Sequence, residues 1–239
     1  TVKELVSLCG GLPDPVAADN PLRYKMSWSP RGVLSAAGNP ARYLSHGEVI
    51  SVPGEELLLS TTPTNRISTL RLEVIPNRDS LSYRELYGVP KVQTICRGTL
   101  RYEGWANAMH ALKAIGLFDK TEVPGLSVDD PYAFLQRSFP DGKVTDVALR
   151  RLMSSKGVRD VDSAMEAVRW LDLTKSNGKP APDNKPASPV DALCKLLEER
   201  LQYKEGEKDM VAMFHTVTGE MPDGSVESHT SRLLAFGTP

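Results

Sequence analysis

The sequence predicts an α+β fold, in which a mixed, largely antiparallel sheet domain carries an inserted helical subdomain. In the first hundred and the last thirty residues, apolar and polar side chains alternate over short runs, which is typical of half-buried strands. Between them, apolar residues recur at the three- and four-residue spacing of amphipathic helices. We therefore expect a sheet domain over residues 1–102 and 206–239 and a helical subdomain over 103–205.

The first element of the sheet domain is expected to be a strand over Thr1–Cys9, because an apolar run there ends at Gly10-Gly11. The segment after the glycines is predicted to be a loop. Ser29-Pro30 predicts the start of a short helix, since serine caps helices and proline suits the first turn. Similar patterns predict the next elements: strands over 48–52 and 70–74, a turn over 76–79, a brief helix over 83–87 and a strand over 92–102.

The helical subdomain is predicted from three long apolar stripes and one shorter stripe. These helices cover 105–115, 144–153, 164–171 and 190–201, the last opened by Ser188-Pro189. Between the last two helices, Thr174–Ala187 is rich in Lys, Pro, Asn and Asp, which predicts a mobile loop. The strand pattern then returns as a long hairpin over 209–236, with its turn at Pro222–Ser225.

Composition excludes several classes of protein. A formal net charge of -1 with mixed signs argues against nucleic-acid binding and against a basic membrane surface. No apolar run approaches the roughly 18 residues of a membrane span. Three scattered cysteines and four histidines without metal spacing predict neither a disulfide framework nor a metal site. We expect a reduced intracellular protein.

Arginines follow two of the predicted strands. Arg78 lies in the turn after one strand, and Arg101 closes the segment Arg97–Tyr102 of another. Arginine suits two-pronged recognition of carboxylates, and Gly98 within that segment favours a bulge or close approach by a ligand or another backbone. The alternative is that these arginines pair with Glu73, Asp79 or Glu103 on the surface.

Three segments together resemble a known family. They are Cys9–Pro13 with Asn20–Gly32, then Pro76–Ser80, then Arg97–Tyr102. In this order they closely resemble signatures of the substrate domain of the saccharopine dehydrogenase family, and the resemblance covers essentially the whole chain. Three joined motifs are far more specific than any one of them.

The resemblance implies roles for particular residues. Arg78, Thr99, Leu100 and Arg101 match residues that contact saccharopine, and Cys9 is expected to line the same pocket. Trp28 and Ser29 match a pair on the cofactor side of the cleft. The general acid or base is not identified, although Tyr102 and Asp79 lie near the right segments.

The resemblance also implies an activity. Saccharopine carries three carboxylates, and the family oxidises it with NAD or NADP to glutamate and 2-aminoadipate 6-semialdehyde. No Gly-x-Gly-x-x-Gly occurs in this sequence, so we expect the dinucleotide to be bound mainly by a missing domain, and the chain alone to be inactive. Expected partners are that domain and a second copy of the chain, in the cytoplasm or, alternatively, in mitochondria.

Two other functions stay open. One is a related reductase acting on a carboxylated polyamine, for which one of Arg78 and Arg101 would be dispensable. The other is a non-catalytic dimerisation or interaction domain, which would be expected to lose the arginines and the Trp28-Ser29 pair. All four residues are present, so we favour the enzyme.

Overall fold

The computed structural model describes residues 1–139, 141–176 and 186–237. The chain divides into two compact units. The sheet unit comprises Thr1–Ala18, Ala36–Ala106 and Glu205–Pro239, and the helical unit comprises Asp19–Ser35 and Asn107–Lys204. The segment Asp19–Ser35 therefore groups with the helices, whereas the sequence had suggested that it belongs to the sheet. Most of the predicted mobile loop, 177–185, lies outside the described residues.

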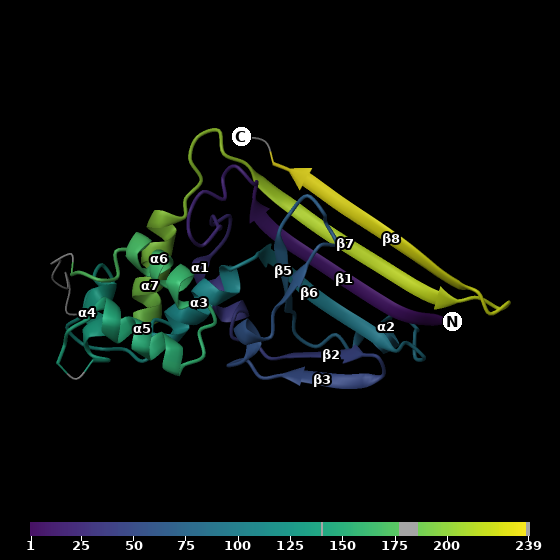
Figure 1. Cartoon of the computed structure of the whole chain (residues 1–239), viewed down its shortest axis with the longest axis horizontal. Helices are drawn as coiled ribbons and strands as arrows, with labels where there is room; N and C mark the ends of the chain where they lie inside the picture. The colour runs from purple at the N-terminus through teal and green to yellow at the C-terminus, as the bar shows by residue number, and fades with distance from the viewer. Residues whose placement is uncertain (140, 177–185, 238–239) are drawn as a thin grey trace. The chain divides into compact units, whose positions relative to one another are not determined.

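The sheet unit contains one eight-stranded sheet with the main strand order β3-β2-β6-β1-β7-β8 (Figure 1). Off this path, β5 pairs with β6, and β4 pairs with β5. The β1–β6 pair is parallel and the other strand pairs are antiparallel, which confirms the predicted mixed, largely antiparallel sheet. The strands are β1 (Val2–Pro13), β2 (Ala41–Ser45), β3 (Glu48–Val52), β4 (Thr62–Thr64), β5 (Leu72–Pro76), β6 (Thr94–Tyr102), β7 (Asp209–Glu220) and β8 (Val226–Phe236).

Strand β1 is longer than the sequence predicts, and the loop expected directly after Gly10-Gly11 begins only after Pro13. Both glycines pair with β7, and the pairing continues to Pro13. Gly10 makes this continuation possible, because a Cβ atom there would lie 2.5 Å from the Leu100 carbonyl oxygen on β6. A glycine pair that looked like a strand end is thus a point of close approach between two strands.

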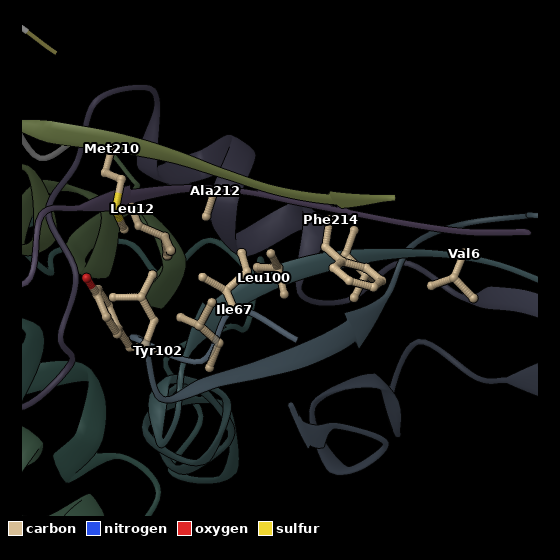
Figure 2. Close-up of a cluster of buried hydrophobic side chains, with 11 residues drawn as sticks. Val6, Leu12, Ile67, Leu100, Tyr102, Met210, Ala212 and Phe214 are labelled. Atoms are coloured by element: carbon tan, nitrogen blue, oxygen red, sulfur yellow. The ribbon is translucent and has the colours of Figure 1, made fainter. Parts of the chain in front are cut away.

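One face of the sheet carries the core of this unit. Alternate residues of β1, β6 and β7 point to this face, and the loop residues Ile67 and Leu70 pack against them. Figure 2 shows the cluster, with side chains from the strands and from Ile67 converging on Leu100. The buried members are Val6, Leu8, Leu12, Ile67, Leu70, Leu72, Leu100, Tyr102, Met210, Ala212 and Phe214.

The opposite face is covered at one end by a second apolar cluster. Its buried part consists of Leu44 of β2, Ile95 of β6 and Val92, which precedes β6. Leu5 of β1 and Tyr83 of the short helix α2 (Tyr83–Leu86) pack against them. The rest of that face carries less buried side chains, which are described below.

In the helical unit, side-chain caps begin three of the helices. Thr145 and Asp160 each accept a hydrogen bond from a backbone N–H three residues on, at 3.2 and 3.0 Å. Ser188 and Asp191 form a capping box at the last helix. The helices are α1 (Pro30–Ala36), α3 (Trp105–Ala114), α4 (Pro131–Gln136), α5 (Asp146–Ser155), α6 (Val161–Trp170) and α7 (Pro189–Arg200), with the first two residues of α3 and the last of α1 assigned to the sheet unit.

Some short elements were not predicted. They are β2, β4, α4 and the 3₁₀ turn Leu57–Leu59. Each is six residues or shorter, so its periodic pattern is too short to stand out in the sequence.

Candidate functional site

Three of the predicted site residues lie on one face of the sheet. Cys9 on β1 is the register partner of Thr99 on β6. Paired residues of neighbouring strands point to the same face, and so do residues two apart along a strand, which places Arg101 on this face as well. The face is opposite to the one that carries the core in Figure 2.

We call the middle of this face the open strip. It lies between the apolar cluster around Ile95 and the buried Arg101, and its side chains come from β1, β6 and β7. Its members are half-buried apart from the exposed Cys9. They are Ser7, Cys9, Arg97, Thr99, Met213 and His215.

Arg101 borders the strip and is only 6% exposed. Its Nη1 atom donates hydrogen bonds to the carbonyl oxygens of Gly11, at 3.3 Å, and Leu100, at 3.1 Å. Its guanidinium carbon lies 5.1 Å from the centre of the Trp105 ring, a cation–π arrangement. Arg101 therefore holds the end of β1 in place, directly beside Cys9.

Glu73 is the register partner of Arg101 and is also buried. Its carboxylate accepts a hydrogen bond of 2.7 Å from the backbone N–H of Ala106, in the first turn of α3. Burial raises the pKa of Glu73, and hydrogen bonds from Ala106, Thr61 and Gly104 offset this only in part. The carboxyl group thus caps a helix start at the edge of the site.

The surroundings of the Cys9 thiol favour its neutral form. Although the residue as a whole is exposed, protein atoms around the thiol raise its pKa, and the nearby charge of Arg101 lowers it by less. A raised thiol pKa disfavours the thiolate at neutral pH. In this state Cys9 can line a binding surface or donate a weak hydrogen bond, but it is poorly suited to act as a nucleophile.

Leu100 and Gly98 point away from the strip. The Leu100 side chain is buried in the core on the opposite face, which leaves it no side-chain contact with a ligand on the strip. A Cβ atom on Gly98 would lie 2.5 Å from Val74 and 2.7 Å from Leu8, so core side chains occupy the space above this glycine. Its pairing with Pro76 continues the β5–β6 register without a bulge, and the expected ligand approach at Gly98 is replaced by core packing.

Arg78 lies away from the strip, in the turn after β5. It is exposed, has a left-handed backbone with φ of 53°, and its carbonyl oxygen accepts a 2.9 Å hydrogen bond from Arg42 N. The β5–β6 register puts Arg78 about five residues of strand from Arg101, or roughly 16 Å. The two predicted arginines can therefore meet only a long ligand.

Trp28 and Ser29 belong to the helical unit. The Trp28 ring is 49% exposed and lies over Gly32, where a Cβ atom would come within 3.0 Å of it. The Ser29 carbonyl accepts a hydrogen bond from Val33 N at the start of α1. An exposed indole held in this way suits stacking against a planar group.

The two residues considered for proton transfer have structural roles. Tyr102 is 1% exposed on the core face, and its hydroxyl donates to the Pro13 carbonyl at 3.0 Å. Asp79 accepts hydrogen bonds from Leu81 N and from Arg42 in an exposed turn. Neither carboxyl nor hydroxyl lies on the open strip.

The structure places Ser7, Arg97 and His215 in the strip. Sequence reasoning did not select Ser7 and His215, and it considered Arg97 with Arg101 as a carboxylate-binding arginine without assigning it to the site. Arg97 could have been assigned to it, because it alternates with Thr99 and Arg101 along one strand. His215 and Ser7 are 208 residues apart, with His215 Nδ1 and Ser7 Oγ separated by 3.0 Å. Only the β1–β7 register brings them together.

A cavity of about 200 Å³ lies elsewhere, within the helical unit. Most of its charged groups already have partners: Lys195 pairs with Asp129 at 2.6 Å, Arg200 pairs with Asp172, and Asp130 accepts a hydrogen bond from the Ser176 hydroxyl at 2.6 Å. These internal pairs leave little to attract a ligand. Among the described residues there is no cluster of three potential metal ligands, and none of the described helices combines the length and apolar character that crossing a bilayer requires.

The glycine pair Gly10-Gly11 does not fit the pyrophosphate of a nicotinamide dinucleotide. A dinucleotide site needs free backbone N–H groups in a glycine-rich turn that opens a helix. Gly10 and Gly11 instead lie inside β1 and are paired with β7. Gly10 and Gly11 therefore do not form a pyrophosphate cradle.

Comparisons with known proteins agree with this arrangement. The profile of the saccharopine dehydrogenase C-terminal domain matches residues 1–238. The mitochondrial alpha-aminoadipic semialdehyde synthase of Bos taurus is 38% identical over 99% of the chain, which covers 26% of that protein. The saccharopine dehydrogenase [NADP(+), L-glutamate-forming] of Schizosaccharomyces pombe is 34% identical over 100% of the chain, which covers 54% of that protein.

A solved structure extends the likeness to three dimensions. The apo saccharopine dehydrogenase (L-Glu forming) of Saccharomyces cerevisiae superposes with a TM-score of 0.84 at 32% sequence identity. The match covers all of this chain and 54% of the yeast chain. The chain thus spans about a quarter to a half of the length of these relatives. It belongs to the saccharopine dehydrogenase C-terminal domain family.

Proposed function

We propose that the chain is the substrate-binding part of a saccharopine dehydrogenase that forms L-glutamate. The observation that carries this proposal is the family match from residue 1 to residue 238. The relatives from both fission and budding yeast are named as NADP(+)-dependent, L-glutamate-forming enzymes. The open strip supports the proposal, because it gathers Cys9 and Thr99 beside Arg101 on one accessible face.

In the proposed reaction, saccharopine loses a hydride from the carbon on the lysine side of its secondary amine. A nicotinamide cofactor, NADP or NAD, supplies the hydride-accepting chemistry. Water adds to the resulting carbon–nitrogen double bond, and cleavage releases L-glutamate and 2-aminoadipate 6-semialdehyde. The residues of this chain bind and orient the substrate: Thr99 and Cys9 contact it, Arg101 fixes the strand under it, and Arg78 binds a distant carboxylate.

The test uses the full-length protein and follows saccharopine-dependent reduction of NADP, with NAD in parallel. Arg78→Ala should raise KM for saccharopine by roughly tenfold to a hundredfold, because a charge-assisted contact to a carboxylate is lost. Arg71→Ala is the matched control, since Arg71 is exposed and ion-paired with Glu103. If the protein used a carboxylated polyamine and not saccharopine, the proposed function would be wrong and the related reductase would be the correct assignment.

We further propose that the chain pairs with a second copy through the β7–β8 hairpin. Strand β8 lies at the edge of the sheet, and the hairpin exposes the apolar side chains of Val217, Leu233, Leu234 and Phe236. Exposed apolar groups beside an edge strand favour association. Leu233→Asp should shift the protein toward monomer in light scattering, whereas Val147→Asp, at an exposed apolar site of the helical unit, should not.

The other proposed partner is a dinucleotide-binding segment, in the same polypeptide, that supplies the cofactor site. For location we propose the cytoplasm. Mitochondria are the alternative, and the bovine relative is named as mitochondrial. A fluorescent fusion of the full-length protein, imaged with a mitochondrial marker, distinguishes the two compartments.

A further inference from the structure

The open strip contains a row of polar residues that none of the expected roles uses. Ser7 on β1 is the register partner of Arg97 on β6 and of His215 on β7. The three side chains therefore stand next to one another on the same face. The adjacent row consists of Thr99, Cys9 and Met213, so this polar row lies directly beside the expected substrate residues.

The row is organised before any ligand binds. His215 Nδ1 lies 3.0 Å from Ser7 Oγ, which orients the imidazole ring. When the Ser7 hydroxyl donates to Nδ1, the ring proton resides on Nε2 and can be donated to an acceptor. The Arg97 guanidinium lies over the Tyr83 ring at 4.6 Å, which restrains it at the edge of the apolar cluster.

The row offers donors and a positive charge without a carboxylate to neutralise them. The next row, on the side away from Thr99, consists of the apolar residues Leu5, Ile95 and Val217. On β8 the register partner of His215 is Ser231. Among the described residues, neither Arg97 nor His215 forms an ion pair with a carboxylate. An arginine that is half-buried and lacks an acidic partner is suited to receive one from a ligand.

The spacing fits one carboxylate. Neighbouring strands are about 4.8 Å apart, so the Cα atoms of Arg97 and His215 lie about 10 Å apart with Ser7 between them. A carboxylate above Ser7 could accept from the guanidinium on one side and from the imidazole on the other. Thr99, two residues along β6, is only about 7 Å away.

We propose that Arg97, Ser7 and His215 form a carboxylate subsite that binds one of the three carboxylates of saccharopine. Arg97 and His215 contact the carboxylate, and Ser7 positions the His215 ring. The inference rests on the proposed function, since it specifies how that substrate lies on the strip. It adds a specificity-determining contact two residues along β6 from Thr99, on the side opposite to Arg101.

The test combines variants with altered substrates in the full-length protein. Arg97→Gln should raise KM for saccharopine roughly tenfold to a hundredfold with kcat changed by only a few-fold, because a contact present throughout the reaction is lost. His215→Gln should raise KM by about tenfold, and Ser7→Ala by less. The matched controls are Arg71→Gln and His229→Gln, whose exposed side chains lie in ion pairs outside the strip.

Three saccharopine analogues, each with one carboxylate replaced by an amide, identify the bound group. The unaltered protein should discriminate against one analogue much more than against the others. Arg97→Gln should abolish that discrimination and keep the other preferences, which a purely structural role of Arg97 would not do. Because Arg97 also packs on Tyr83, thermal melting is measured for every variant; if Arg97→Gln unfolds, His215→Gln and Ser7→Ala are tested against the same analogues.

The outcomes separate the two proposals. Saccharopine turnover with unchanged KM in folded Arg97→Gln and His215→Gln variants overturns the subsite and leaves the proposed function standing. An equal rise in KM of the variants for saccharopine and for all three analogues also overturns the subsite, because the contact would then not be specific to one carboxylate. Failure of the unaltered protein to use saccharopine overturns the proposed function and the subsite with it.

Discussion

The sheet unit and the helical unit of this chain are organised by interactions of very different range. In the helical unit, the caps of α5, α6 and α7 join residues three apart in the sequence. In the sheet unit, the contact between Arg101 and Gly11 spans 90 residues, and that between His215 and Ser7 spans 208. The first kind of interaction can be recognised in a short segment, and the second depends on strand register.

The units also differ in how their charges are used. The cavity of the helical unit is lined by acids and bases that neutralise one another, such as Lys195 with Asp129. On the open strip of the sheet unit, Arg97 has an aromatic ring as its neighbour instead of a carboxylate. This difference teaches that a cavity lined by charged groups need not mark the functional site, and that unneutralised donors on a rigid sheet are the better guide here.

The sharpest test of the two sheet faces compares neighbouring residues on β6. Leu100→Ala should lower the free energy of unfolding by about 2–5 kcal/mol, because it empties space in the core of Figure 2. Thr99→Ala, on the open strip, should change stability by about 0.5 kcal/mol or less and raise KM for saccharopine. Chemical denaturation and steady-state kinetics measure the two effects. Equal destabilisation by both substitutions would contradict the assignment of the faces.

A second test compares the two adjacent glycines of β1. Gly10→Ala should destabilise by about 1–3 kcal/mol, since the new Cβ atom would lie 2.5 Å from the Leu100 carbonyl oxygen and β1 would have to shift. Gly11→Ala should be near neutral, because nothing lies within 4 Å of its added Cβ atom. The melting temperatures of the two variants, compared with that of the unaltered protein, measure this difference in stability. If Gly11→Ala were the more harmful substitution, the strip would be closed over Gly11 rather than open.

These two tests show where sequence reasoning succeeded and where it could not. Arg101 and Thr99 were predicted in one segment, and their side chains lie on one face of β6. The helices from α5 to α7 were predicted within a few residues of their observed bounds. Leu100 was grouped with them, although alternation along the strand sends its side chain into the core. The partnership of Ser7 with His215 has no local signal, because it arises from the pairing of distant strands.

The helical unit offers a test of its local character. Ser188→Ala should lower stability by about 1 kcal/mol, because the Ser188 hydroxyl accepts from Asp191 N and the Asp191 carboxylate accepts from Ser188 N in the capping box of α7. Ser154→Ala is the control, since Ser154 is exposed near the end of α5. Denaturation curves compare the variants. No difference between them would mean that α7 is fixed by packing alone, and saccharopine kinetics should be unaffected in either case.

The smallest effect is expected at Glu73, which caps the first residues of α3 within the sheet unit, and it should depend on pH. Burial raises the pKa of Glu73 in the folded state above its unfolded value. Below the unfolded value the group is protonated in both states and its full stabilising contribution is present; as pH rises through the folded pKa, that contribution is lost. Glu73→Gln keeps an oxygen that can accept from Ala106 N and carries no charge at any pH.

The stability of Glu73→Gln relative to the unaltered protein should therefore increase as pH rises above the ordinary glutamate pKa of about 4.3, because the unfolded state loses the Glu73 proton before the folded state does. Urea denaturation at several pH values measures this difference. Glu103→Gln is the control for removing one negative charge from the same region, because Glu103 contacts Arg71 rather than the α3 backbone. A difference that decreased with rising pH would mean that hydrogen bonds to the Glu73 carboxylate outweigh the cost of burying it, and Glu73 would then be a charged helix cap rather than a buried acid.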